Sequence, residues 1–110
     1  MNKYMLLYMT PVSAEDQMQN TDPEEGKKIN DMWMAWFGKC GDAIVDGGVP
    51  LGKAMNVSQE GKSKGESKVG GYSIMQADDV ETLEGLLDGH PHLMMPGASV
   101  EILEMLPMPM

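Results

Sequence analysis

The sequence contains no arginine, a single cysteine and few aromatic residues. Arginine is the side chain best suited to gripping phosphate groups. The 8 basic residues are all lysines, and 17 acidic residues outnumber them, which gives a formal charge of −9. These features argue against binding to nucleic acid or to an anionic membrane.

The lone cysteine excludes an intrachain disulfide and a cysteine-based metal cluster. We expect Cys40 to be a buried, unreactive thiol, because it falls on the apolar stripe of a predicted helix. No apolar run approaches the length that crosses a membrane. The run at residues 4–9 is also too short for the core of a signal peptide. We therefore expect a cytoplasmic protein.

The sequence has enough apolar residues for a packed core, at 42% of its 110 residues, so we expect a single domain over residues 1–110. Apolar runs predict strands at 4–9, 54–57, 69–76 and 99–106. A first helix is predicted from Asp22 to the Gly47-Gly48 pair, and a second from Asp78 to Gly89. Residues 59–68, rich in Gly, Ser and Lys, predict a mobile hairpin loop.

The order strand, helix, strand, strand, helix, strand predicts an α+β, ferredoxin-like βαββαβ fold. Its four-stranded antiparallel sheet would carry both helices on one face. The first strand is apolar on both faces, and the chain offers nothing to cover the second face. We therefore expect a homodimer in which two sheets pack together.

Both histidines lie in one turn, His90-Pro91-His92. Proline favours extended geometry before it, so the two rings could lie on the same side of the chain. A metal site would need a third ligand at a recognisable spacing, and none is present. We expect no metal and no cofactor. An acid-base role for one imidazole and a structural role in the turn are the two alternatives.

Aromatic residues recur at helical spacing along the first helix, at Trp33, Trp36 and Phe37. Such a stripe usually belongs to a core, and we expect this for Trp36 and Phe37. Trp33, nearer the start of the helix, is the candidate wall of a substrate pocket.

The chain resembles the YCII-related family over nearly its whole length. The likeness is carried in order by KYMLLYM, WMAWFGKCGDAIVDGGVPLG, GGYSIMQADDVETLEGLL and GHPHL followed by SVEILEM. The resemblance implies a dimeric α+β barrel, and an acid-base pair of one His and one Asp has been proposed for the family. At least one relative removes chloride from a chlorinated aromatic compound. Similar barrels include lactone isomerases and small monooxygenases.

Carried onto this sequence, the family's histidine falls on Asp31 and its aspartate falls on His90, so the two residue types are exchanged. The resemblance therefore implies His90 and Asp31 as catalytic candidates. His92 is a further catalytic candidate, because the geometry at Pro91 could turn its ring inward, and Trp33 is the substrate-binding candidate from its place on the helix. Asp31 lies on the opposite side of the helix from Trp33, Trp36 and Cys40, which is also typical of a solvated carboxylate.

Two functional hypotheses follow. The first is a cofactor-independent enzyme, similar to a lyase, an isomerase or a dehydrochlorinase, that uses a histidine for proton transfer on a small cyclic or aromatic molecule. The second is a non-catalytic homodimer that binds a small ligand or acts as an interaction module.

Overall fold

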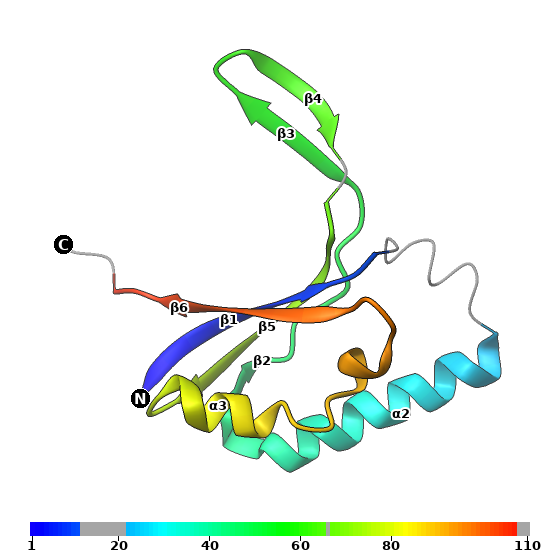
Figure 1. The fold of residues 1–110 in the computed structure, drawn as a ribbon, viewed down its shortest axis with the longest axis vertical. Helices are drawn as coiled ribbons and strands as arrows, with labels where there is room; N and C mark the ends of the chain where they lie inside the picture. Colours follow the sequence, from blue (N-terminus) through cyan, green and yellow to red (C-terminus); the bar gives the residue numbers. More distant parts are fainter. Residues whose placement is uncertain (12–21, 66, 108–110) are drawn as a thin grey trace.

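A four-stranded antiparallel sheet carries two helices on one of its faces in a computed structural model of the chain (Figure 1). The structure describes residues 1–11, 22–65 and 67–107. The strand order is β2-β5-β1-β6, which is the ferredoxin-like arrangement. The predicted α+β fold class is therefore confirmed. The elements are β1 (Asn2–Met9), α2 (Pro23–Cys40), β2 (Ile44–Asp46), β3 (Ala54–Ser58), β4 (Gly61–Gly65), β5 (Val69–Ala77), α3 (Val80–Leu86) and β6 (Ser99–Met105).

The core lies between the sheet and the two helices. Alternate residues of β1 point into it, and Leu6 has no exposed surface. Met75 of β5 and Leu83 of α3 are also fully buried. Trp36 and Cys40 are the buried residues of α2. The predicted burial of Cys40 is confirmed, and burial raises the pKa of its thiol.

Helix α2 begins where its capping residues predict and ends earlier than expected. Asp22 caps it by accepting a 3.0 Å hydrogen bond from the backbone N–H of Glu24. The predicted extension to the Gly47-Gly48 pair is wrong, because the helix stops at Cys40. Gly41 follows with a φ of 55°, a left-handed geometry that suits glycine and ends the helix. Ile44 then enters strand β2 instead of continuing the apolar stripe.

The second sheet strand is therefore not the one that the sequence predicted. β2, at Ile44–Asp46, pairs with β5, whereas the expected strand near 54–57 lies outside the sheet. That segment is β3, and it pairs with β4 in a separate two-stranded hairpin. The predicted loop at 59–68 is wrong over Gly61–Gly65, which forms β4. We call residues 53–68 the arm.

Helix α3 begins one residue later than expected, since Asp79 and not Asp78 is its cap. The Asp79 carboxylate accepts hydrogen bonds from both the hydroxyl and the backbone N–H of Thr82. These bonds lower the pKa of Asp79. Among the described residues, no helix is both long enough and apolar enough to span a membrane.

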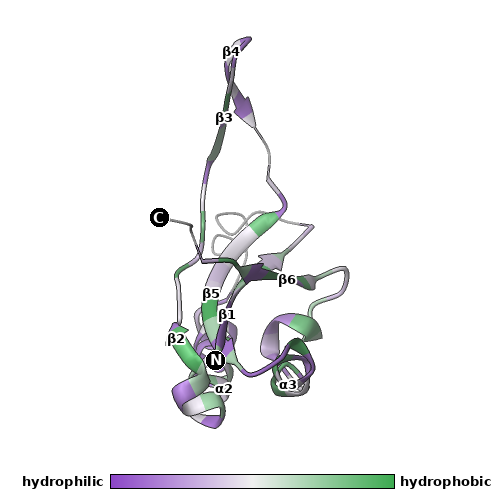
Figure 2. Cartoon of the chain, turned by 90° about the vertical axis from the view of Figure 1, so that its left-hand side faces the viewer, coloured by the Kyte–Doolittle hydropathy of each residue, from purple (hydrophilic) through white to green (hydrophobic). Residues whose placement is uncertain are grey.

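No described helix lies on the face of the sheet opposite α2 and α3, and the arm rises on this side (Figures 1 and 2). Met5 is paired with Ile74 on β5 and with Leu103 on β6, and these three side chains share the uncovered face. Leu103 and Met105 are 44% and 40% exposed. We call this surface the bare face. It is apolar along its centre, as predicted from the two-sided apolar pattern of residues 4–9.

Candidate functional site

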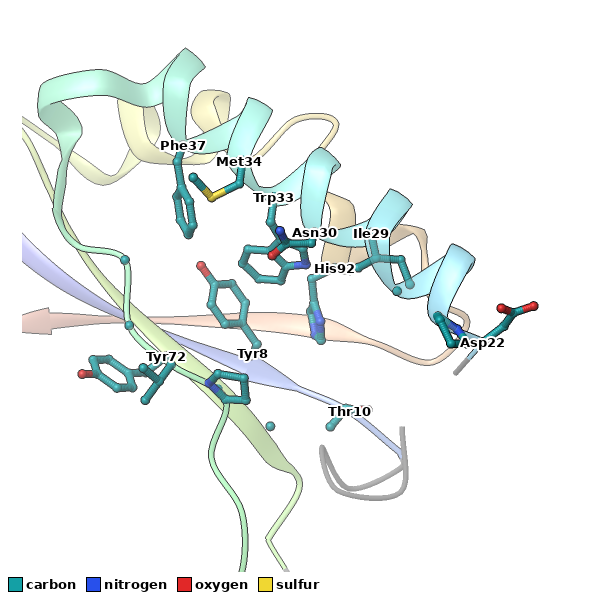
Figure 3. Close-up of a pocket in the computed structure, with 18 residues that line it drawn as sticks. Tyr8, Thr10, Asp22, Ile29, Asn30, Trp33, Met34, Phe37, Tyr72 and His92 are labelled. Carbon is teal, nitrogen blue, oxygen red and sulfur yellow. The ribbon is translucent and has the colours of Figure 1, made fainter. Parts of the chain in front are cut away.

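A cleft of about 710 Å³ lies between α2 and the sheet (Figure 3). Its walls come from α2 between Pro23 and Phe37, the end of β1, the connection after β2, the start of β5, and the turn that holds His92. Its volume is within the usual range for small-molecule sites. The lining residues are Tyr8, Thr10, Asp22, Pro23, Gly26, Ile29, Asn30, Trp33, Met34, Phe37, Gly47, Gly48, Val49, Pro50, Gly70, Gly71, Tyr72 and His92.

The backbone forms one wall of the cleft because two glycines allow a close approach. A Cβ on Gly48 would collide with the carbonyl oxygen of Tyr72, and the φ of Gly48 is 75°. A Cβ on Gly70 would come within 2.7 Å of the Thr10 side chain. A larger residue at position 48 would push the connection after β2 away from β5, and one at position 70 would push against Thr10 at the end of β1.

Tyr8 lies at the floor of the cleft and is held by a chain of hydrogen bonds. Its hydroxyl donates to Oγ of Ser73 at 2.7 Å, and Ser73 donates to the carbonyl oxygen of Gly47 at 2.8 Å. Burial is the main reason that the pKa of Tyr8 rises to about 12. Tyr8 is therefore a neutral phenol at physiological pH, and its oxygen retains acceptor capacity.

Six rings, including that of Tyr8, pack together at the floor of the cleft. Tyr8 and Trp33 meet edge to face, with centroids 4.9 Å apart and planes at 89°. The two imidazoles also contact Tyr8, at centroid distances of 5.2 Å for His90 and 5.3 Å for His92. Aromatic pairs of this kind add about 0.5–1.5 kcal/mol beyond their buried area. This aromatic cluster comprises Tyr8, Trp33, Trp36, Phe37, His90 and His92.

His90 is fully buried inside this cluster and does not line the cleft. Its Nδ1 accepts a hydrogen bond from the backbone N–H of His92, so the proton of the neutral ring resides on Nε2. Nε2 has no hydrogen-bond partner among the described residues. Its ring packs against Trp33 and Trp36, at 4.6 and 4.2 Å, whose π electrons are weak acceptors. Burial, and secondly the neighbouring His92, lowers the pKa of His90 to about 4.

His92 is 8% exposed and lines the cleft. Its Nε2 lies 2.8 Å from the carbonyl oxygen of Met9 and 3.1 Å from that of Ser99. Both partners are acceptors, so Nε2 carries a proton and donates it. This ring thereby joins the end of β1 to the start of β6. No hydrogen bond joins Nδ1 of His92 to any residue of the described part of the chain.

The structure brings together two of the four site residues predicted from the sequence. Trp33 and His92 line the same cleft, and both contact Tyr8. His90 lies directly behind them. Asp31 is exposed on α2 and is not among the lining residues. Within the described ranges, no group of three or more His, Cys, Asp or Glu side chains could hold a metal ion.

Sequence reasoning missed several lining residues. Tyr8 was read only as part of an apolar strand, although its hydroxyl made it a candidate polar group. Tyr72 donates a 3.2 Å hydrogen bond to the Asp46 carboxylate, whose charge is the main reason that the pKa of Tyr72 is raised. Residues 47–50 line the cleft because β2 ends at Asp46 and the chain then turns along the cleft wall. No local sequence pattern predicted the end of this strand.

No protein-family model matches the sequence, and no curated protein matches it. The fold is similar to a solved structure of 5-chloro-2-hydroxyhydroquinone dehydrochlorinase (TftG) from Burkholderia phenoliruptrix AC1100, in complex with 2,5-dihydroxybenzoquinone. The superposition covers 92% of this chain and 91% of that chain, with a TM-score of 0.47 and 14% sequence identity. A likeness this distant says nothing about the residues of the cleft.

Proposed function

We propose that this chain is a homodimeric, cytoplasmic member of the YCII-related family, a dimeric α+β barrel. It binds a small, flat organic ring in the cleft between α2 and the sheet, and His92 accepts a proton from that molecule. The observation that carries the proposal is the position of His92. Its ring lines the cleft while its Nε2 is fixed by two carbonyl oxygens.

The walls of the cleft favour a flat, partly apolar ligand. Trp33 and Phe37 supply ring surfaces, and Ile29 and Met34 supply aliphatic surface on α2 (Figure 3). Few polar groups interrupt these walls. A hydroxylated six-membered ring matches this pattern, since its faces are apolar and its oxygens lie at the edge.

His92 is oriented for proton acceptance. Because Nε2 donates to the Met9 and Ser99 carbonyls, the lone pair of the neutral ring is on Nδ1. When Nδ1 takes a proton, the same two carbonyl dipoles stabilise the imidazolium that forms. His90 is enclosed and remains neutral, so we assign it the positioning of the turn, and we assign proton transfer to His92.

The reaction class that fits is proton abstraction coupled to loss or movement of a group. His92 would take a proton from the bound ring. In an elimination, the electron pair left behind would form a double bond while an anion such as chloride departs. In an isomerisation, the double bond would shift and protonated His92 would return the proton to another atom of the ring. Such an elimination or isomerisation needs no redox partner. General base catalysis typically contributes about 10²–10⁴-fold in rate.

The alternative is a binding protein without catalysis, and one observation favours it. Among the described residues, no carboxylate forms a hydrogen bond with either imidazole. Asp31, the partner implied by the family resemblance, is exposed and outside the cleft. In this alternative, His92 serves as a hydrogen-bond acceptor for the ligand.

The homodimer is proposed from the bare face. Met5, Leu7 and Met9 are only partly buried by their own chain, and no described helix lies over them. A contiguous apolar surface of this kind marks an interaction site. A second copy placed sheet to sheet would cover it, with about 10 Å between the two layers.

Chloride release from chlorinated hydroquinones, measured by ion chromatography under nitrogen, tests the catalytic form of the proposal. The matched variants are His92→Gln and Asp31→Asn. Gln can still donate near the position of Nε2 but offers no base. We expect the wild type to release chloride, His92→Gln to lose about a hundredfold or more, and Asp31→Asn to stay close to wild type. Full activity in His92→Gln would overturn the role of His92. Saturable binding without turnover would favour the binding protein.

A further inference from the structure

The arm has the features of an interaction surface. β3 and β4 pair only with each other, and all their residues except Ala54 and Gly65 are exposed. An isolated two-stranded hairpin is at best marginally stable in water. The arm joins the main sheet at its root, where Leu51 N donates to Gly70 O and Thr10 N donates to Lys68 O.

One face of the arm combines apolar and basic side chains. Met55 is paired with Lys64, and Val57 with Lys62, so these four side chains lie on the same face of the hairpin. Met55 and Val57 are 61% and 68% exposed, which is unusual for apolar residues in a strand. The opposite face carries Asn56 and Ser63 and is polar.

Charge separates the arm from the rest of the molecule. Residues 53–68 hold four lysines and two glutamates, whereas the rest of the chain holds four lysines and fifteen acidic residues. Two copies of such a chain repel each other as they approach. A basic arm reaching onto the acidic surface of a second copy would offset that repulsion.

The geometry directs the arm toward a second copy. Figures 1 and 2 show the hairpin rising from the start of β5, at one end of the sheet, on the side opposite α2 and α3. Five residues of strand span about 17 Å, whereas packed sheets are separated by about 10 Å. An arm of this length passes a sheet stacked on the bare face and reaches the far side of that layer.

We propose that the arm clasps a second copy of this chain, with Met55 and Val57 in apolar contact and Lys62 and Lys64 against acidic side chains. This inference rests on the proposed homodimer and adds a contact outside the sheet interface. The bare face supplies apolar area, and the arm supplies charge complementarity.

The test is the dimer dissociation constant, measured by analytical ultracentrifugation for the full chain. One variant is Lys62→Glu with Lys64→Glu. Its control is Lys27→Glu with Lys28→Glu, which makes the same change of charge on exposed α2 positions. A second variant, Met55→Ser with Val57→Ser, removes the apolar contact. Circular dichroism shows whether each variant keeps the fold.

We expect the Lys62/Lys64 variant to raise the dissociation constant by about tenfold or more at low salt. The Lys27/Lys28 control should raise it far less. The difference should shrink in high salt, since the screening length falls from about 10 Å at 0.1 M to about 3 Å at 1 M. The Met55/Val57 variant should weaken the dimer at both salt concentrations.

The possible failures are distinguishable. A stable wild-type dimer that neither arm variant weakens would overturn the clasp and leave the sheet interface standing. Equal weakening by the Lys62/Lys64 variant and its control would overturn the specific role of the arm, since only net charge would then matter. A wild-type chain that stays monomeric would overturn both the homodimer and the clasp.

Discussion

The backbone N–H of His92 donates a 2.9 Å hydrogen bond to Nδ1 of His90. The imidazole of His90 therefore holds the backbone of His92 in place. The two rings also occupy different environments. His90 is enclosed by Trp33 and Trp36, whereas His92 reaches the cleft. The extended geometry that Pro91 imposes on His90, with φ of −62° and ψ of 134°, produces this arrangement.

The burial of His90 predicts that the free energy of unfolding depends on pH. Above pH 6.5 its ring is neutral in both the folded and the unfolded chain. Below that pH, the unfolded chain takes up a proton with the ordinary pKa of 6.5, whereas the folded chain resists until about pH 4. The free energy of unfolding should therefore fall as the pH drops from 6.5 to 4, by about 3 kcal/mol at most.

Urea unfolding of the wild type and of His90→Asn over this pH range measures that contribution. Asn keeps an acceptor for the His92 N–H but does not titrate. We expect the variant to be less stable at pH 7 and to lose less stability on acidification. Parallel curves for the two proteins would show that His90 is not the titrating group.

Two conservative substitutions of His92, to Asn and to Gln, are expected to reduce the stability of the fold by different amounts. Its Nε2 satisfies carbonyl oxygens at the end of β1 and the start of β6. His92→Asn cannot reach both and should lose about 1–3 kcal/mol, because buried acceptors are left unpaired. His92→Gln, which places a donor further out, should lose less. Thermal and urea unfolding at pH 7 compare the two, and equal losses would mean that the Nε2 contacts do not stabilise the fold.

A substitution at Tyr8 measures how much the hydrogen-bond chain to Gly47 contributes to the free energy of unfolding. Tyr8→Phe removes the donor to Ser73, and we expect a loss of about 1 kcal/mol. Tyr4→Phe is the matched control, since Tyr4 is also buried in β1 but its hydroxyl forms no hydrogen bond with another described residue. Urea unfolding of both variants makes the comparison. A Tyr8→Phe variant as stable as Tyr4→Phe would show that the hydrogen bonds from Tyr8 to Gly47 do not stabilise the fold.

If two copies pack through the bare face, a charged residue in place of Leu7 should prevent the dimer from forming. Leu7→Asp places a charge at the centre of the proposed interface, where an unpaired buried charge costs several kcal/mol. Light scattering at micromolar concentration should show a dimer for the wild type and a monomer or an unfolded chain for the variant. Leu93→Asp is the control, because Leu93 is exposed and off the sheet. A well-folded wild-type monomer would contradict the interface.

The sequence predicted the fold because strong local patterns coincide with its elements. The capping residue Asp22, the short apolar run of residues 4–9 and the apolar stripe of α3 each favour a single type of element. The second strand was misplaced because Ile44 fits both the helical spacing and a strand. Gly41 decided between them through its backbone conformation. Strand β4 of the arm was missed, since its alternating lysines and serines carry little strand signal.

The candidate site was only partly predictable for a related reason. The sequence placed both histidines in one turn, but only tertiary packing determines which ring faces the cleft. Trp33 was identified from its place on the helix, and it does line the cleft. Tyr8 and the segment 47–50 join the site through long-range pairing with β5, which no local pattern encodes.

The most direct test of the cleft uses the two tryptophan indole N–H signals in a ¹H–¹⁵N NMR spectrum. Trp33 lines the cleft, whereas the Trp36 indole donates a 2.8 Å hydrogen bond to Leu86 O and lies outside it. Hydroxylated benzenes and quinones, including 2,5-dihydroxybenzoquinone, are titrated into the ¹⁵N-labelled protein, and Trp33→Phe assigns the signals. A saturable shift of the Trp33 signal with little change at Trp36 is predicted for at least one compound. No shift at Trp33 for any compound at millimolar concentration, or a larger shift at Trp36, would contradict the proposed ligand site.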